Sequence, residues 1–163
     1  MQKKSNHMGR CRSALRTCAW ALLLTVAGAG AAQAQIQTAA MARYEQECAA
    51  CHIAYPPGML PQASWAHLLQ GLNRHFGVDA SLDAATQQEI GGWLQQHAGS
   101  FRHVREAPPQ DRISKSAWFV NQHDEVSAAV FKRKAVGGAS QCAACHPNAA
   151  KGRFSEREVR IPK

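Results

Sequence analysis

Two short stretches of the sequence combine paired thiols with an imidazole. The letters CAACH occupy positions 48–52 and return at positions 142–146. In a Cys-x-x-Cys-His motif, each thiol can add to a vinyl group of a haem as a thioether, and the adjacent histidine can bind the iron. The two motifs therefore predict two covalently bound haem c groups, attached through Cys48, Cys51, Cys142 and Cys145, with His52 and His146 as proximal iron ligands.

Two other uses of such motifs fit the sequence less well. Paired CxxC ligands of a zinc site normally lie roughly 15–20 residues apart, whereas the second motif begins 94 residues after the first. A pair of structural disulfides would not need a histidine directly after each motif. All four cysteines that follow residue 34 belong to the two motifs, so no thiol is left for another purpose.

The ligand on the other face of each iron has to come from elsewhere in the chain. A methionine there would raise the reduction potential relative to a second histidine. After residue 34 the only methionines are Met41 and Met59, both close to the first motif, and Met59 is too near His52 to reach the opposite haem face easily. Histidines are the better supply. Only 17 residues follow His146, so the second distal ligand is expected upstream of that motif.

Two histidines lie on apolar helical faces near aromatic residues. His75 falls beside Leu72 and Phe76, where an unpartnered imidazole would be costly to bury. His123 follows Phe119 by one helical turn on the same face. We therefore predict His75 as the distal ligand of the first haem and His123 as the distal ligand of the second.

Three further histidines leave alternatives open. His97 shares an apolar face with Trp93 and Leu94 and is the strongest competitor for a distal position. His103 lies in a loop with two arginines, where it could contact a haem propionate or replace His123. His67 lies off the hydrophobic stripe of its helix and is predicted to be exposed.

Residues 1–34 are predicted to be a cleaved signal peptide. A basic segment that includes Lys3, Lys4 and Arg10 precedes the apolar run 19–27, which is too short to span a bilayer. Ala32-Gln33-Ala34 has the small-x-small pattern of a cleavage site. The sequence thus predicts export to the periplasm, and an uncleaved membrane anchor is the alternative.

The excess of basic residues lies mostly in this leader. The whole chain has 19 Lys and Arg against 11 Asp and Glu, a formal net charge of +8. Five of the basic residues and none of the acidic ones precede residue 35, so the remainder carries only +3. Nucleic acid is therefore a poor candidate partner. From residue 131 onward, eight basic residues stand against two glutamates, which favours either neutralisation of haem propionates or docking of an acidic partner.

The apolar pattern predicts a mainly α fold that brings these residues together. Helices are expected from about Gln37 to His52, from a Ser64 cap to Phe76, from an Asp79 or Ser81 cap to Ala98, from Ser114 or Ser116 to Val126, and over the second motif from a Ser140 cap. We divide the chain into an N-terminal haem region (35–98), a linker with a double proline (99–111) and a C-terminal haem region (112–163). The two haem-binding regions are expected to pack closely together.

Four stretches carry a resemblance that extends well beyond CxxCH: ECAACHIAYPPGMLPQASW at 47–65, HFGVDASLD at 75–83, RISKSAWFVNQH at 112–123 and CAACHPNAAKGRFSEREVRIP at 142–162. Together they resemble the dihaem cytochrome c family of proteobacteria. The resemblance implies a small helical c-type cytochrome, a periplasmic electron carrier with bis-histidine ligation of both haems, in which His75 and His123 match the family's distal histidines. It also implies partners: a small oxygen-binding monohaem cytochrome and membrane-embedded b-type cytochromes.

Two functions follow from these expectations. The first is electron transfer, without enzymatic activity, from a quinol-linked membrane donor (a b-type cytochrome) to a soluble haem partner. Imidazole on both faces lets the iron change oxidation state without changing its ligands. The alternative is a small haem enzyme that reduces oxygen, nitrite or peroxide at one open iron, which requires that His75 or His123 does not bind.

Overall fold

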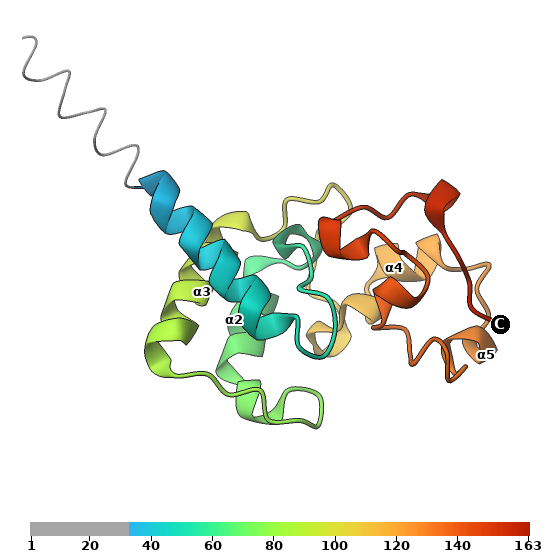
Figure 1. The fold of residues 1–163 in the computed structure, drawn as a ribbon, viewed down its shortest axis with the longest axis horizontal. Coiled ribbons are helices and arrows are strands. Elements are labelled where there is room, and N and C mark those ends of the chain that lie inside the picture. The colour runs from blue at the N-terminus through green and yellow to red at the C-terminus, as the bar shows by residue number, and fades with distance from the viewer. Residues whose placement is uncertain (1–32) are drawn as a thin grey trace, which may run out of the picture. The chain divides into compact units, whose positions relative to one another are not determined.

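The computed structural model describes residues 33–163, so the predicted signal peptide lies almost entirely outside the described residues. Residues 40–163 form one compact unit, and residues 33–39 belong to a separate one. Residues 33–48 are helical. The α-helices that follow are α2 (Gln62–Gln70), α3 (Ala84–His97), α4 (Ala117–Gln122) and α5 (Ala128–Phe131) (Figure 1).

Short 3-10 helices connect these elements: η1 (Pro57–Met59), η2 (Leu72–Arg74), η3 (Pro109–Asp111), η4 (Ile113–Lys115), η5 (Cys142–Ala144), η6 (Ala149–Lys151) and η7 (Glu156–Glu158). Residues 33–163 contain no β-strand, only an isolated antiparallel bridge between His75 and Val78. The prediction of a mainly α fold is confirmed.

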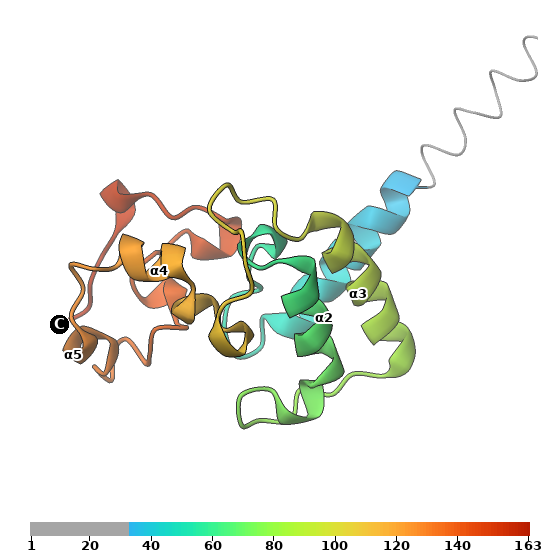
Figure 2. The same ribbon diagram turned by 180° about the vertical axis from the view of Figure 1, so that it is seen from behind.

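The apolar core belongs to the N-terminal haem region, where α2 and α3 lie side by side in both ribbon views (Figures 1 and 2). Tyr44 is 4% exposed; its ring meets Trp65 edge-on at 6.2 Å between centroids and lies 5.3 Å from Trp93. Such aromatic contacts add to the free energy gained by burying the rings. The members of this core cluster are Ala40, Tyr44, Leu60, Trp65, Ile90, Trp93 and Leu94.

Helix α3 begins later than the sequence predicted. Its N-cap is Asp83, whose carboxylate accepts hydrogen bonds from the backbone N–H groups of Ala85 and Thr86, each at 3.0 Å. The predicted cap Asp79 instead accepts from the N–H of Ser81 at 2.9 Å and closes a turn before the helix. An aspartate can serve either structure, so the spacing alone did not identify the cap.

Helix α2 departs from the prediction at both ends. It begins after Pro61, which is the N-cap, and the predicted cap Ser64 is completely buried inside the helix. It ends at Gly71, where the backbone leaves helical geometry. The predicted continuous helix to Phe76 is therefore wrong: η2 follows the glycine, and His75 sits in a turn after it.

The linker packs against the turn that follows the first motif. The N–H of Gly99 donates to the carbonyl of Leu60 at 2.8 Å, and the N–H of Phe101 donates to Gly58 at 3.3 Å. A Cβ at Gly58 would overlap the side chains of Ser100 and Phe101, so this approach requires glycine.

The C-terminal haem region has little core of its own. Ser116, one of its two predicted caps, begins α4 by accepting the N–H of Phe119 at 3.2 Å. Helix α4 ends at Gln122, short of the predicted Val126. Within residues 112–163, the buried apolar residues are only Phe119, Val136 and Ala149.

Truncation of the core should test this distribution. Ile90 is fully buried, so Ile90→Ala should lower the free energy of unfolding by about 2–5 kcal/mol. The same substitution at Ile161, which is 47% exposed, should change it by less than about 0.5 kcal/mol. Guanidinium unfolding of the haem-loaded protein, followed by far-ultraviolet circular dichroism, measures both. Equal losses in the two variants would contradict this account of the core.

Candidate functional site

The structure brings the first motif's histidine together with His75. The helix 33–48 ends at Cys48, and a turn carries the chain to His52, whose Nδ1 lies 2.6 Å from the carbonyl oxygen of Ile53. A tight turn holds His75, with Phe76 at φ 50° and the N–H of Val78 donating to the His75 carbonyl at 3.1 Å. The ring centroids of His52 and His75 are 6.2 Å apart, with 39° between the ring planes.

The second motif's histidine faces His123 in the same way. The 3-10 helix η5 spans the motif, in place of the predicted Ser140-capped helix, and the N–H of His146 donates to the carbonyl of Cys142 at 2.8 Å. His123 is the C-cap of α4, and its Nδ1 lies 2.8 Å from the Phe119 carbonyl. The ring centroids of His123 and His146 are also 6.2 Å apart, and their planes cross at 79°.

This separation matches the spacing that a shared metal would impose. Two imidazoles that bind opposite faces of one metal ion through bonds of about 2 Å place their ring centroids roughly 6 Å apart. In each pair, one histidine orients its ring through a carbonyl and leaves Nε2 for a ligand bond. Both pairs therefore have the centroid separation that a shared iron would impose.

The other histidine of each pair is half-buried, and its Nδ1 atom has no polar partner within the described residues. The Nδ1 atoms of His75 and His146 are inaccessible and make no hydrogen bond in the part of the chain that the structure describes. Burial lowers the pKa of His75, with further lowering from His52 and Arg112. Burial likewise lowers the pKa of His146, with a contribution from His123. Neutral imidazole is the form that binds a metal, so these surroundings fit an iron ligand.

The four motif cysteines are free thiols in this structure. Burial raises the pKa of Cys48 to about 11, with a further contribution from the negative charge of Glu47. Burial also raises the pKa of Cys142 to about 11.

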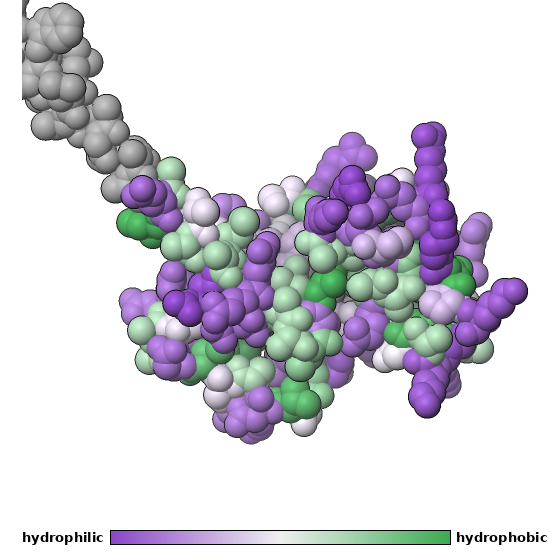
Figure 3. Space-filling view, in the orientation of Figure 1, coloured by the Kyte–Doolittle hydropathy of each residue, from purple (hydrophilic) through white to green (hydrophobic). Residues whose placement is uncertain are grey.

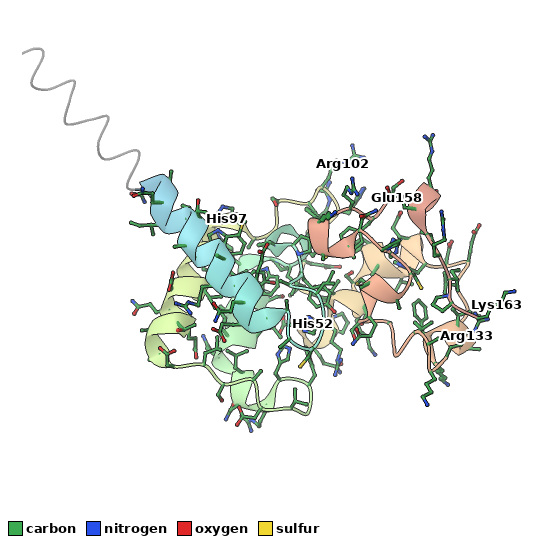
Figure 4. The ribbon with its side chains drawn as sticks, viewed as in Figure 1. His52, His97, Arg102, Arg133, Glu158 and Lys163 are labelled. Atoms are coloured by element: carbon green, nitrogen blue, oxygen red, sulfur yellow. The ribbon has the colours of Figure 1, made fainter. Side chains whose placement is uncertain are left out.

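The competing histidines lie outside both pairs. His97 packs on Trp93, with 4.8 Å between ring centroids, and its Nδ1 lies 2.8 Å from the Trp93 carbonyl oxygen. It lies well apart from His52 in Figure 4. His67, predicted to be exposed, has 66% of its side chain accessible and approaches Asp111 at 3.5 Å. His103 is exposed in the linker. The assignment of the iron ligands remains a prediction, and the two facing pairs are the ones predicted.

Several residues around the pairs were not identified from the sequence. Phe131 lies 6.1 Å from His123, and Phe154 lies 5.5 Å from His146, measured between ring centroids. Arg112 places its guanidinium 4.0 Å from the ring centroid of Phe76. Each phenylalanine follows its histidine by eight residues, with a break in the helical structure between them, so helical spacing did not indicate the contact. Arg112 opens one of the stretches that carry the resemblance, but nothing in the sequence indicated its contact with Phe76.

Comparison with known proteins places the chain in a family. The family model described as dihaem cytochrome c matches residues 44–154, so this chain belongs to the dihaem cytochrome c family. It accordingly carries two covalently bound haem c groups, each with an iron atom. A search of curated proteins finds no match to this chain.

Solved structures of diheme cytochromes c resemble more than two thirds of this chain. The diheme cytochrome c of Shewanella baltica OS155 is 37% identical, with a TM-score of 0.67, and the match covers 76% of this chain and 94% of that one. The DHC purified from Rhodobacter sphaeroides is 40% identical with a TM-score of 0.59, covering 69% and 95%. A second structure, of diheme cytochrome c from Rhodobacter sphaeroides, is 38% identical with a TM-score of 0.61, covering 69% and 94%.

The angles between the histidine planes predict two different ferric spectra. In a low-spin ferric haem with two imidazole ligands, perpendicular ring planes leave two iron d orbitals nearly equal in energy, whereas more parallel planes split them. We expect electron paramagnetic resonance to show one signal with a single very large g value, from the His123–His146 pair at 79°. The second signal should be less anisotropic, from the His52–His75 pair at 39°.

Two variants assign these signals. His123→Gly should remove the strongly anisotropic signal and leave the other in place. His97→Ala is the matched control, because this ring packs on Trp93 and outside both pairs; it should leave both signals unchanged. Loss of either low-spin signal in His97→Ala would mean that His97, and not the predicted residue, binds iron.

Proposed function

We propose that this dihaem cytochrome c is a periplasmic electron carrier in which both irons are bound by two histidines. The observation that supports the proposal most strongly is the facing of His52 with His75 and of His123 with His146, at the same centroid separation of 6.2 Å. The family membership supports the coarser part, a cytochrome with two covalent haems. No helix within residues 33–163 is long and apolar enough to cross a membrane.

The protein's own residues would hold the two irons in place and occupy both faces of each haem. The bound haem c supplies an iron that accepts and releases one electron. Histidine pairs that fill both faces keep the ligands the same in the oxidised and reduced states, which keeps structural rearrangement small. The carbonyl oxygens of Ile53 and Phe119 lie within hydrogen-bond distance of the rings of His52 and His123 and fix the orientation of these rings. Paired histidines also favour a lower reduction potential than a methionine ligand would.

A small haem enzyme is the alternative function. Reduction of oxygen, nitrite or peroxide needs one iron face open to the substrate. That reaction would require His75 or His123 to leave its position opposite the motif histidine. Both residues are held by their own turns: the His75 N–H donates to the Leu72 carbonyl at 3.3 Å, and the His123 N–H donates to the Val120 carbonyl at 3.2 Å. These hydrogen bonds favour irons that have both faces occupied and no face open to a substrate.

The proposed donor is a membrane-embedded, quinol-linked b-type cytochrome, and the proposed acceptor is a small monohaem cytochrome of the oxygen-binding type. The surface charge of the C-terminal haem region supports docking of an acidic partner. The eight basic residues from residue 131 onward are all exposed, and within residues 33–163 none of them forms an ion pair. Hydrophilic side chains project from this half of the molecule (Figure 3), and Arg133 and Lys163 mark its outer end (Figure 4).

Carbon monoxide separates the carrier from the enzyme. We expect an optical titration of the purified protein to show two low-spin haems per chain that ignore the gas after reduction. His123→Gly is the positive control, because it opens one iron face and should bind about one carbon monoxide per chain. A high-spin band, or carbon monoxide binding by the unsubstituted protein, would favour the haem enzyme over the electron carrier.

Charge reversal tests the docking of an acidic partner. The double variant Lys151→Glu, Arg153→Glu should slow reduction of an acidic monohaem cytochrome by roughly tenfold or more at low salt. The control Arg102→Glu, Arg105→Glu makes the same charge change in the linker, where both arginines are also exposed. Stopped-flow absorbance measures the rate, and the difference should shrink at high ionic strength. Equal slowing by the two double variants would argue against a docking role of the C-terminal residues.

A further inference from the structure

Tyr55 contacts both haem-binding motifs. Its ring stacks on the ring of His52, with 4.6 Å between centroids and 26° between planes. Its hydroxyl donates a hydrogen bond of 2.5 Å to the backbone carbonyl of Ser140, two residues before Cys142. Burial raises the pKa of this phenol, and the nearby Cys142 raises it further, which agrees with a position between the two motifs. One side chain thus joins segments that lie 85 residues apart.

The core holds the backbone of Tyr55 in place. The buried Tyr44 donates its hydroxyl to the carbonyl of Tyr55 at 2.7 Å. The indole N–H of Trp65 donates to the Pro57 carbonyl, two residues later, at 2.8 Å. Both donors belong to the core cluster of the N-terminal haem region. The Tyr55 ring is therefore a fixed support.

The turn after Tyr55 also reaches the segment beyond the second motif. Pro56 lies against Gly152, where a Cβ would stand 3.9 Å from the proline ring. Gly152 has φ 68°, a conformation that favours glycine, and it ends η6. The second motif is thus approached from both sides by the same short segment, at Ser140 before it and at Gly152 after it.

From these contacts we propose that Tyr55 is a positioning residue for both haem sites. Its ring fixes the plane of the His52 imidazole, and its hydroxyl fixes the backbone that leads into the second motif. The two roles use different atoms of one side chain. The inference depends on the two haem sites and not on the direction or partners of electron transfer, so it would survive a failure of the electron-carrier proposal.

Two substitutions separate the roles of the ring and the hydroxyl. Tyr55→Phe keeps the stacking and removes the donor to Ser140. We expect faster amide hydrogen exchange over residues 138–146 of the haem-loaded protein and no change in the ferric resonance of the first site. Tyr55→Leu removes both contacts, so it should show the faster exchange and also shifted g values for the first site.

The control is Ile90→Val, a small loss of buried core volume outside both motifs. In this variant, the g values of the first site and the amide exchange over residues 138–146 should equal those of the unsubstituted protein. Unchanged exchange in Tyr55→Phe would overturn the role of the hydroxyl. Unchanged g values in Tyr55→Leu would overturn the role of the ring. Equal effects from Ile90→Val would overturn both proposed roles of Tyr55, because a general loss of stability would then explain them.

Discussion

The proposed haem sites depend on one constraint: two imidazoles must face each other at the separation that a shared iron atom would set. Both pairs keep 6.2 Å between ring centroids. Partial burial, and then the facing ring, lowers the pKa of His75 and of His146, and their Nδ1 atoms have no hydrogen-bond partner within the described residues. Without a metal, placing the two rings at this distance costs free energy, and no bond between them compensates for that cost. With an iron between the rings, the same arrangement gains two ligand bonds, so the fold and its cofactors are interdependent.

Each site is local in sequence, and the two sites differ in how much protein supports them. His52 precedes His75 by 23 residues, and His123 precedes His146 by the same interval, so each ring pair closes only a short loop. The first pair adjoins the aromatic core around Tyr44. The second has few buried apolar residues of its own, so the haem must supply much of the apolar volume there. Tyr55 extends the order of the first site to the second.

The sequence predicted best those features that depend on a regular period or a fixed motif. Trp93 and Leu94, which helical spacing placed on one apolar face, are both buried in α3. The stacking of Phe119 on His123, at 4.0 Å, follows from the same rule. The predicted helix through His75 is wrong because α2 stops at Gln70, and the turn that holds His75 depends on a positive φ at Phe76 that no periodicity encodes. Contacts such as that of Tyr55 with Ser140 depend on tertiary packing and had no local signal.

Similar ligands do not make the two sites equivalent. In the first pair the motif histidine is fixed by a carbonyl and by a stacked tyrosine. In the second pair the distal histidine has the carbonyl, and a stacked phenylalanine supports it. The ring planes also differ, at 39° and 79°. Hydrogen bonds to ligands and the polarity around them tune a haem's potential, so under the proposed ligation we expect the two irons to differ in their affinity for an electron. Two unequal sites linked through Tyr55 would suit the electron relay that we propose.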